Sequence, residues 1–452
     1  MRIENSKHWL GGHDIRPLDQ STMGTVAKPS KGKVPLSIMA VIVCAFAFVG
    51  VMYTENIGFL THSSILGIAP CLNILSGPVE TETLDEKLDF EPGNCNVEDG
   101  MWVFNNLSKP LYSDQTCPYL DLQVTCAKNG RPDSDYLYWE WQPDECNIPR
   151  FDAAVVLEKL RGKRLMFVGD SLQKGQWQSF VCMVQSHIPD RQKSMRRGRV
   201  HNIFKAKEYN ATIEFYWAPF LVESNSDIHV IPDPNDRILR VDSIYKHARH
   251  WTELDILVFN TYVWWMSGMK IKSLWGSFAN GEEGYEELEA STAYRIALKT
   301  WANWVDSNIN PNKTRVFFTT MSPTHMRSAD WHHRKGIRCY NETSPVLEKG
   351  YWGSGSDRRM MKVVTSIVGR MKVPVSFINI TQISEHRKDG HTSVYTESQG
   401  KVLTDEQKAD PKKYADCTGA VSPHAEVCFV SSETIIWVQY FGLQDNSVNA
   451  FM

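Results

Sequence analysis

The stretch RLMFVGDSLQKGQWQSFVCMV, residues 164–184, determines the fold class of this chain. It opens with a short apolar run, Arg164–Val168, which ends at Gly169 and predicts a buried strand. Apolar residues then recur at the i, i+3, i+4, i+7 spacing of an amphipathic helix: Trp177, Phe180, Val181 and Val184. A buried strand that turns through a glycine into a helix is the repeating unit of α/β proteins.

The same alternation continues along the chain. Further strands are predicted at 255–259, 316–319 and 375–378, and further helices around 294–305 and 357–371. This order predicts a parallel sheet with helices on both faces.

Polar residues stand where two of these strands end, which is where open α/β sheets bind ligands. Gly169 permits a tight turn, and Ser171 lies near a helix N-terminus whose N–H groups can stabilise an oxyanion. Asn260, at the end of the 255–259 strand, is a second candidate donor to that oxyanion. Structural alternatives exist: Ser171 as an N-cap, Asp170 as a turn former and Asn260 as a strand cap.

An uncharged segment, Val34–Thr54, lies near the N-terminus. At 1.5 Å per residue it spans roughly 30 Å, the hydrocarbon thickness of a bilayer. Lysines precede it and Glu55 follows, so the positive-inside rule predicts a cytosolic tail (1–33) and a luminal C-terminal part. A cleaved signal peptide is the alternative, disfavoured by the length and position of the apolar run.

Cysteines and sequons agree with a luminal location. The spacing of the cysteines after the anchor does not suggest zinc fingers, and it favours a disulfide framework in an oxidising compartment. Five N-x-S/T sequons are candidate glycosylation sites: Asn106, Asn210, Asn312, Asn341 and Asn379.

Charge and composition narrow the class further. Apolar residues make up 42 % of the chain, enough for a substantial core, and the net charge of −3 gives no field for nucleic acid. A local basic run predicts a solvated loop or, alternatively, a site for an acidic sugar: Lys193, Arg196, Arg197 and Arg199.

Composition also divides the luminal part. We predict a stem at 55–94, a cysteine-rich N-terminal subdomain at 95–152, the α/β domain at 153–417 and a tail at 418–452.

Several longer blocks resemble the plant trichome-birefringence-like family. In order, they are GMWVFNN, KPLYS, NGRPDSDYLYWEWQPDECNIPRFD, FVGDSLQKGQWQSFVC, FNTYVWW and TTMSPTHMRSADW, and the resemblance covers about residues 90–417. The members that acetylate xylan look most similar. The resemblance implies an SGNH-hydrolase-like fold in a single-pass type II Golgi membrane protein. It also implies acetyl transfer through an acetyl-serine to xylan or a related hemicellulose, from acetyl-CoA or another acetyl carrier.

Site residues follow from the resemblance position by position. Ser171 matches the nucleophile and Asp170 the acid of the GDS motif, while Asn260 matches the strand-end residue near the oxyanion. Asp416 matches the aspartate of the family's C-terminal DxxH motif. In such a site a histidine takes the serine proton and the aspartate orients that histidine.

The chain departs from the family pattern after Asp416. Gly419 occupies the histidine position of DxxH, and the remainder does not resemble the family ending. His424 and the loop residue His391 are candidate replacements for the base, with a structural role as the alternative for His391. Two other functions therefore stay open: a catalytically inactive glycan-binding or scaffold member of a Golgi complex, and an acetyl esterase.

The resemblance also bears on the cysteines. Cys417 matches the first cysteine of the motif and is expected to pair with Cys339, and Cys95 is paired with Cys146 by position. Cys117 and Cys182 are further disulfide candidates. The sequence suggests no metal site, because the adjacent His332 and His333 have poor geometry for a shared ion and indicate a surface loop.

Overall fold

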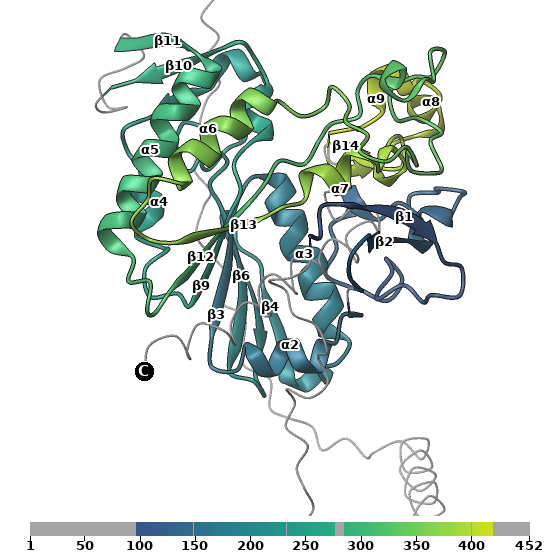
Figure 1. The fold of residues 1–452 in the computed structure, drawn as a ribbon, viewed down its shortest axis with the longest axis horizontal. Helices are drawn as coiled ribbons and strands as arrows, with labels where there is room; N and C mark the ends of the chain where they lie inside the picture. Colours follow the sequence, from purple (N-terminus) through teal and green to yellow (C-terminus); the bar gives the residue numbers. More distant parts are fainter. Residues whose placement is uncertain (1–95, 148, 232, 276–283, 399, 419–452) are drawn as a thin grey trace, which may run out of the picture. The chain divides into compact units, whose positions relative to one another are not determined.

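Strand β3 (Arg164–Gly169) lies at the centre of a seven-stranded sheet in the order β13-β12-β9-β3-β6-β5-β4 (Figure 1). The structure, a computed structural model, describes residues 96–418 apart from 148, 232, 276–283 and 399. The other strands of this sheet are β4 (Lys193–Arg196), β5 (His201–Ala206), β6 (Ala211–Trp217), β9 (Ile256–Phe259), β12 (Arg315–Thr319) and β13 (Val375–Ile378).

The sheet is mixed, so the prediction of a parallel sheet holds only in part. Strands β13, β12, β9, β3 and β6 pair in parallel, whereas β5 and β4 are antiparallel. The reason lies in the connections: β4, β5 and β6 follow one another through short turns, which suit hairpins but are too short for a parallel crossover. The predicted basic loop therefore begins inside strand β4, with Lys193 and Arg196.

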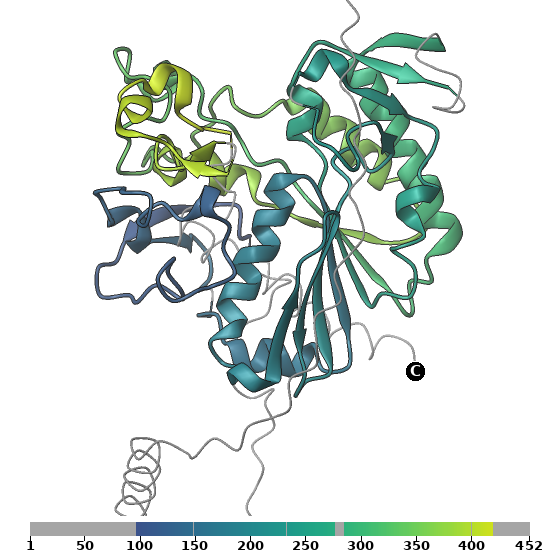
Figure 2. The same ribbon diagram turned by 180° about the vertical axis from the view of Figure 1, so that it is seen from behind.

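Two layers of helices cover the sheet, as predicted. Alternate residues of β3 point to opposite faces, with Phe167 packing in the cluster of α2 and α3 and Val168 in the cluster of α5 and α6. Figures 1 and 2 show the sheet between these layers from both sides. The helices are α2 (Ala153–Lys159), α3 (Ser171–Gln185), α5 (Ala290–Asn308) and α6 (Arg358–Val368).

A second, four-stranded sheet was not predicted. Its order is β11-β10-β8-β7, and β10 and β11 lie beside one end of α5 (Figure 1). Its strands and the helix nearby are β7 (Glu223–Ser224), β8 (Ile238–Arg240), α4 (Tyr245–Ala248), β10 (Lys270–Leu274) and β11 (Tyr285–Glu289).

The cysteine-rich N-terminal segment packs against the C-terminal segment. Strands β1 (Gly100–Phe104) and β2 (Trp139–Pro143) pair antiparallel, and Trp102 donates its indole N–H to the Ile383 carbonyl at 3.0 Å. Figure 1 shows the two segments in the same part of the molecule. The C-terminal elements are α7 (Thr381–Glu385), β14 (Glu397–Ser398), β15 (Lys401–Val402), α8 (Asp405–Lys408) and α9 (Pro411–Tyr414).

Buried arginines join the two segments. Arg387 is 1 % exposed, forms an ion pair with Asp389 at 2.9 Å and donates to the Tyr136 carbonyl. Arg131 donates to the carbonyl oxygens of Asp389 and His391 across the same boundary. Because these charges are paired and hydrogen-bonded, their burial fixes the orientation of the two segments.

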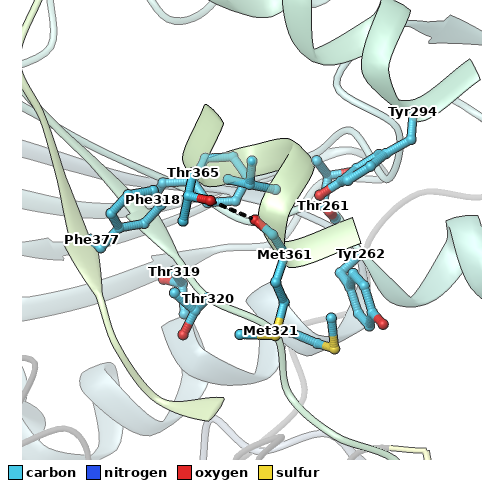
Figure 3. Close-up of a pocket in the computed structure, with 11 residues that line it drawn as sticks. Thr261, Tyr262, Tyr294, Phe318, Thr319, Thr320, Met321, Met361, Thr365 and Phe377 are labelled. Carbon is cyan, nitrogen blue, oxygen red and sulfur yellow. Dashed lines mark hydrogen bonds between the residues drawn. The ribbon is translucent and has the colours of Figure 1, made fainter. Parts of the chain in front are cut away.

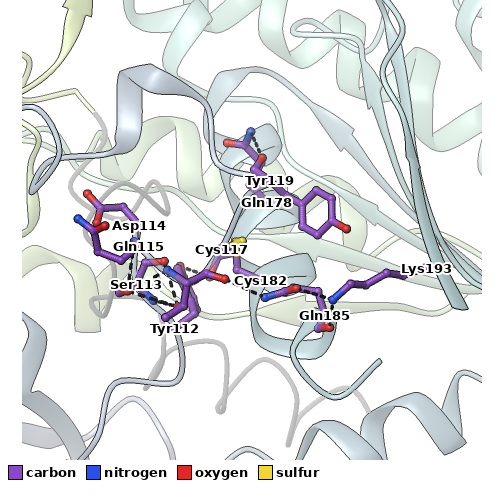
Figure 4. The surroundings of a disulfide bond; sticks show 12 residues. Tyr112, Ser113, Asp114, Gln115, Cys117, Tyr119, Gln178, Cys182, Gln185 and Lys193 are labelled. Carbon is purple, nitrogen blue, oxygen red and sulfur yellow. Dashed lines mark hydrogen bonds between the residues drawn. A yellow bond between two sulfur atoms is a disulfide. The ribbon is translucent and has the colours of Figure 1, made fainter. Parts of the chain in front are cut away.

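Two disulfides are described. Cys117–Cys182 links the N-terminal subdomain to α3 (Figure 4), and the predicted pair Cys339–Cys417 is confirmed. Cys146 is also disulfide-bonded, while its predicted partner Cys95 lies outside the described residues. Cys126 is buried and belongs to neither of these two disulfides.

The predicted membrane anchor, residues 34–54, lies outside the described residues, as do the stem and residues 419–452. Among the described residues, no helix is both long enough and apolar enough to cross a bilayer.

We expect the Cys117–Cys182 disulfide to stabilise the fold, because it closes a loop with a sequence separation of 65. Replacing both cysteines with serine should lower the free energy of unfolding by about 2–4 kcal/mol in urea denaturation. Cys126→Ala is the matched control, since it removes a buried sulfur that is not part of this cross-link. An equal loss in both variants would show that the cross-link itself contributes nothing.

Candidate active site

The turn between β3 and α3 depends on the missing side chain of Gly169. A Cβ built at this position would lie 2.4 Å from the backbone oxygen of Asn260 and 2.8 Å from Cβ of Gln173. The end of β3 therefore lies directly against the end of β9, and the chain must enter α3 without a side chain here.

Asp170 is the N-cap of α3. Its Oδ1 accepts a hydrogen bond from the Leu172 N–H at 2.8 Å, and Ser171 is the first helical residue. The alternative that Ser171 caps the helix is therefore wrong, because the preceding aspartate already fills that role. The Ser171 hydroxyl is therefore not the group that caps the helix.

The Asp170 carboxyl is 0 % exposed. Burial raises its pKa from the ordinary 3.8 to about 7, although backbone N–H groups of Leu172, Gln173 and Tyr262 oppose the shift. The Asp170 carboxyl, next to Ser171, therefore changes between its neutral and its ionised form near neutral pH.

Ser171 lines a cavity of about 390 Å³ at the carboxyl edge of the sheet. Its side chain is half-buried, and Lys174, one helical turn on, faces the same cavity. The remaining walls come from the N-terminal subdomain, helix α3, the β4–β5 turn, strands β5 and β6 and the segment after β7: Asp121, Gln123, Val124, Gln178, Arg197, Gly198, Arg199, Asn202, Phe215, Trp217, Ile228 and Val230.

Asn260 follows β9, as predicted, next to Gly169. Its side-chain amide donates to the carbonyl oxygens of Thr319 at 3.1 Å and Thr320 at 3.3 Å. Donation to an oxyanion at Ser171 would require the amide to give up one of these bonds. Its role in the oxyanion site stays a prediction.

Asp416 is held within its own turn. Its backbone pairs with Ser393, and its Oδ1 accepts from both the N–H (3.0 Å) and the hydroxyl (2.6 Å) of Thr418. Gly419 and His424 lie outside the described residues. The aspartate of the broken motif is therefore anchored, and its assigned role as the orienting residue stays a prediction.

The buried His391 side chain forms a hydrogen bond with the buried side chain of His325. Its Nε2 lies 2.8 Å from Nδ1 of His325, whose Nε2 lies 2.8 Å from the Glu385 carbonyl oxygen. Burial lowers the pKa of His325 to about 4, so this ring is neutral and its single proton is on the nitrogen that faces the carbonyl. His391 must then donate through Nε2, which makes that nitrogen unsuitable as a base.

The other predicted polar sites are at the surface. Asn106, Asn210, Asn312 and Asn341 are exposed, whereas Asn379 is half-buried and donates its amide to Glu98. His333 pairs with Glu342, and the described residues hold no group of three side chains that could bind a metal ion.

A second cavity lies on the opposite face of the sheet, behind Tyr262 (Figure 3). Its volume is about 40 Å³, and its walls are mainly apolar, with Phe318, Met321 and Phe377 among them. A space of this size holds about one water molecule and no sugar residue.

Comparison with known proteins identifies the family. Residues 148–419 match PC-Esterase, a GDSL/SGNH-like acyl-esterase family found in Pmr5 and Cas1p, and residues 93–147 match the PMR5 N-terminal domain. The chain belongs to the PC-esterase family. The resemblance to trichome-birefringence-like proteins is thereby confirmed.

Three relatives of this PC-esterase illustrate the similarity. Protein trichome birefringence-like 3 of Arabidopsis thaliana is 56 % identical in an alignment of 409 residues that covers 86 % of this chain and 94 % of that protein. Probable xylan O-acetyltransferase 8 of Oryza sativa subsp. japonica is 52 % identical over 86 % of this chain and 94 % of its own length. Xylan O-acetyltransferase 6 of the same organism is 49 % identical over 72 % of this chain and 59 % of its own length.

Sequence reasoning missed most of the cavity wall around the PC-esterase serine. Lys174 could have been predicted as part of the wall, since it lies three residues after Ser171 on the same helical face. Asp121 and Trp217 could not have been predicted as part of it, because they come from separate segments that only the tertiary fold brings to α3.

We expect Gly169→Ala to disrupt this turn, since its Cβ would overlap the Asn260 carbonyl. Overpacking of this kind costs about 1–3 kcal/mol, which should appear as a lower midpoint in urea. In Gly268→Ala the nearest atom lies at 3.4 Å, so this control should unfold like wild type. Equal stability of all three proteins would contradict the close contact.

The raised pKa of Asp170 predicts a pH-dependent stability. Folding raises this pKa, so between about pH 4 and 7 the folded protein holds a proton that the unfolded chain releases. This contribution to the free energy of unfolding is full below about pH 4 and is lost as the pH rises to 7.

Asp170→Asn, which keeps a capping oxygen, should therefore be stabilised relative to wild type more at pH 8 than at pH 5 in thermal unfolding. Asp152→Asn, at the exposed N-cap of α2, is the control and should show no such difference. A wild-type pH slope in Asp170→Asn would mean that this carboxyl does not titrate with folding.

Proposed function

We propose that this protein transfers acetyl groups from an acetyl donor to hydroxyls of a cell-wall polysaccharide, xylan, through an acetyl-serine at Ser171. The observation that carries the proposal is the position of Ser171: first residue of α3, released from capping by Asp170 and facing a cavity of about 390 Å³. The names of the rice relatives, xylan O-acetyltransferase and probable xylan O-acetyltransferase, support the choice of reaction and acceptor.

The chemistry has two halves. In the first, Ser171 Oγ attacks the acetyl carbonyl carbon, its proton passes to a base, and the donor leaves. In the second, a sugar hydroxyl attacks the acetyl-serine, gives up its proton and restores the serine. The positive end of the α3 dipole, where Ser171 lies, supports stabilisation of the oxyanion in both halves, while the N–H groups of Leu172 and Gln173 bond to the Asp170 carboxyl.

A non-catalytic function is the second candidate, and a specific observation favours it. The DxxH histidine position holds Gly419, and His391, the described candidate for its replacement, donates through Nε2 to His325. Without a base a serine hydroxyl is a poor nucleophile. In that case the cavity binds a glycan without acetylating it, as a scaffold member of a Golgi complex would.

We further propose that the protein is a single-pass type II Golgi membrane protein with residues 55–452 in the lumen. The uncharged segment 34–54 with preceding lysines supports this orientation, and the disulfides support an oxidising compartment.

The test is acetyl transfer by the full chain. Xylopentaose and acetyl-CoA or another acetyl ester are supplied, and acetylated product is measured by mass spectrometry. We expect Ser171→Ala to lower the rate by about 10³-fold or more. Ser186→Ala, an exposed serine at the other end of the same helix, should keep it.

Other outcomes separate the alternatives. Full activity of Ser171→Ala would exclude the serine mechanism. A folded wild type that binds xylopentaose without product, together with product from Gly419→His, would assign this chain the non-catalytic function. Acetate release at the same rate with and without sugar would identify an esterase.

A further inference from the structure

We propose that the cavity beside Ser171 binds an acidic sugar: a uronic acid side group of the acceptor polysaccharide, whose carboxylate pairs with Arg199. The inference rests on the proposed function, because it concerns the acceptor for the same serine.

The charge of the cavity is the first argument. Among the described residues, three cationic side chains line it, Lys174, Arg197 and Arg199, and one carboxylate, Asp121. Asp121 lies 2.5 Å from the Lys174 ammonium and 2.8 Å from the Arg197 guanidinium. The wall is thus net positive in a chain whose formal net charge is −3, so the positive charge is local to this site.

Arg199 is the third of these cations, and Asp121 pairs with the other two, Lys174 and Arg197. It is exposed, and Nη2 lies 3.1 Å from a ring nitrogen of His229. Within the part of the chain that the structure describes, Arg199 has no ion pair with a carboxylate. A guanidinium offers five N–H donors in a planar fork, and this geometry matches a carboxylate bidentately.

Apolar groups in the same cavity suit a sugar ring. Trp217 is half-buried, with Trp264 edge-on at a centroid distance of 5.4 Å. Ile228 and Val230, on the segment after β7, are 51 % and 57 % exposed and line the cavity beside it. Aromatic and aliphatic surfaces of this kind pack against the C–H faces of a pyranose.

The combination favours a uronic acid over a phosphate. A phosphate ion would meet the same cations but would leave the exposed Ile228 and Val230 without a partner. A uronic acid uses both kinds of wall, with its ring on the apolar residues and its carboxylate on Arg199. The acceptor would then be positioned by charge next to the nucleophile.

Binding to the full chain tests the proposal independently of turnover. Titration calorimetry compares xylopentaose with a xylopentaose that carries one glucuronic acid. We expect the acidic oligomer to bind about tenfold tighter at about 50 mM salt, and the difference to vanish at about 1 M, where charges are screened within about 3 Å.

Variants locate the preference. Arg199→Gln should reduce the ratio of the two dissociation constants to below about twofold, which corresponds to the loss of one charge-assisted contact. Arg196→Gln is the matched control: this exposed arginine lies three residues earlier in β4, does not line the cavity, and should leave the tenfold ratio in place.

Two results would overturn the inference while the proposed function stands: equal binding of both oligomers, or an unchanged preference in Arg199→Gln. Displacement of the acidic oligomer from wild type but not from Arg199→Gln by coenzyme A alone would also overturn it, because the cations would then serve the donor. If neither oligomer binds, the inference and the proposed acceptor fall together.

Discussion

The contact between Gly169 and the backbone of Asn260 is the constraint on which the site depends. Because no side chain separates the ends of β3 and β9, the chain can turn into α3 at once. Asp170 then fills the N-cap, and Ser171 becomes the first helical residue with its side chain toward the cavity. One close backbone approach thus decides which of two neighbouring polar residues caps and which is left for chemistry.

The N-terminal subdomain is part of the site. It contributes Asp121, Gln123 and Val124 to the cavity, and the Cys117–Cys182 disulfide ties it to α3. Buried arginines from both segments then hold it against the C-terminal segment. The α/β domain alone would lack one wall of the cavity, which explains physically why the two matched domains occur together in one chain.

The sequence was sufficient wherever a local pattern determines structure. The runs around 164–168 and 316–319, and the periodicity of α3 and α5, predicted the elements because each is amphipathic or fully buried along its length. Strands β4 to β6 were missed, since their charged and polar residues face solvent or one another. The Asp170 cap is a local contact within residues 170–172. The cavity wall depends on which segments meet in space, and no single stretch of sequence contains that information.

The proposed acceptor binding and the proposed proton transfer involve different parts of this chain. The turn at Gly169–Ser171, which carries the proposed nucleophile, and the described cavity walls lie before residue 231. The residues that precede Gly419 are also held in place. The disulfide joins Cys417 to Cys339, and the Cys417 carbonyl accepts a hydrogen bond from the backbone N–H of His325 at 3.0 Å. The backbone of Asp416 pairs with that of Ser393. The chain departs from the family pattern beyond this anchor, where Gly419 occupies the histidine position and the remainder does not resemble the family ending. Under the proposed function, the acceptor cavity can therefore be intact while catalytic competence depends on the segment that follows Cys417.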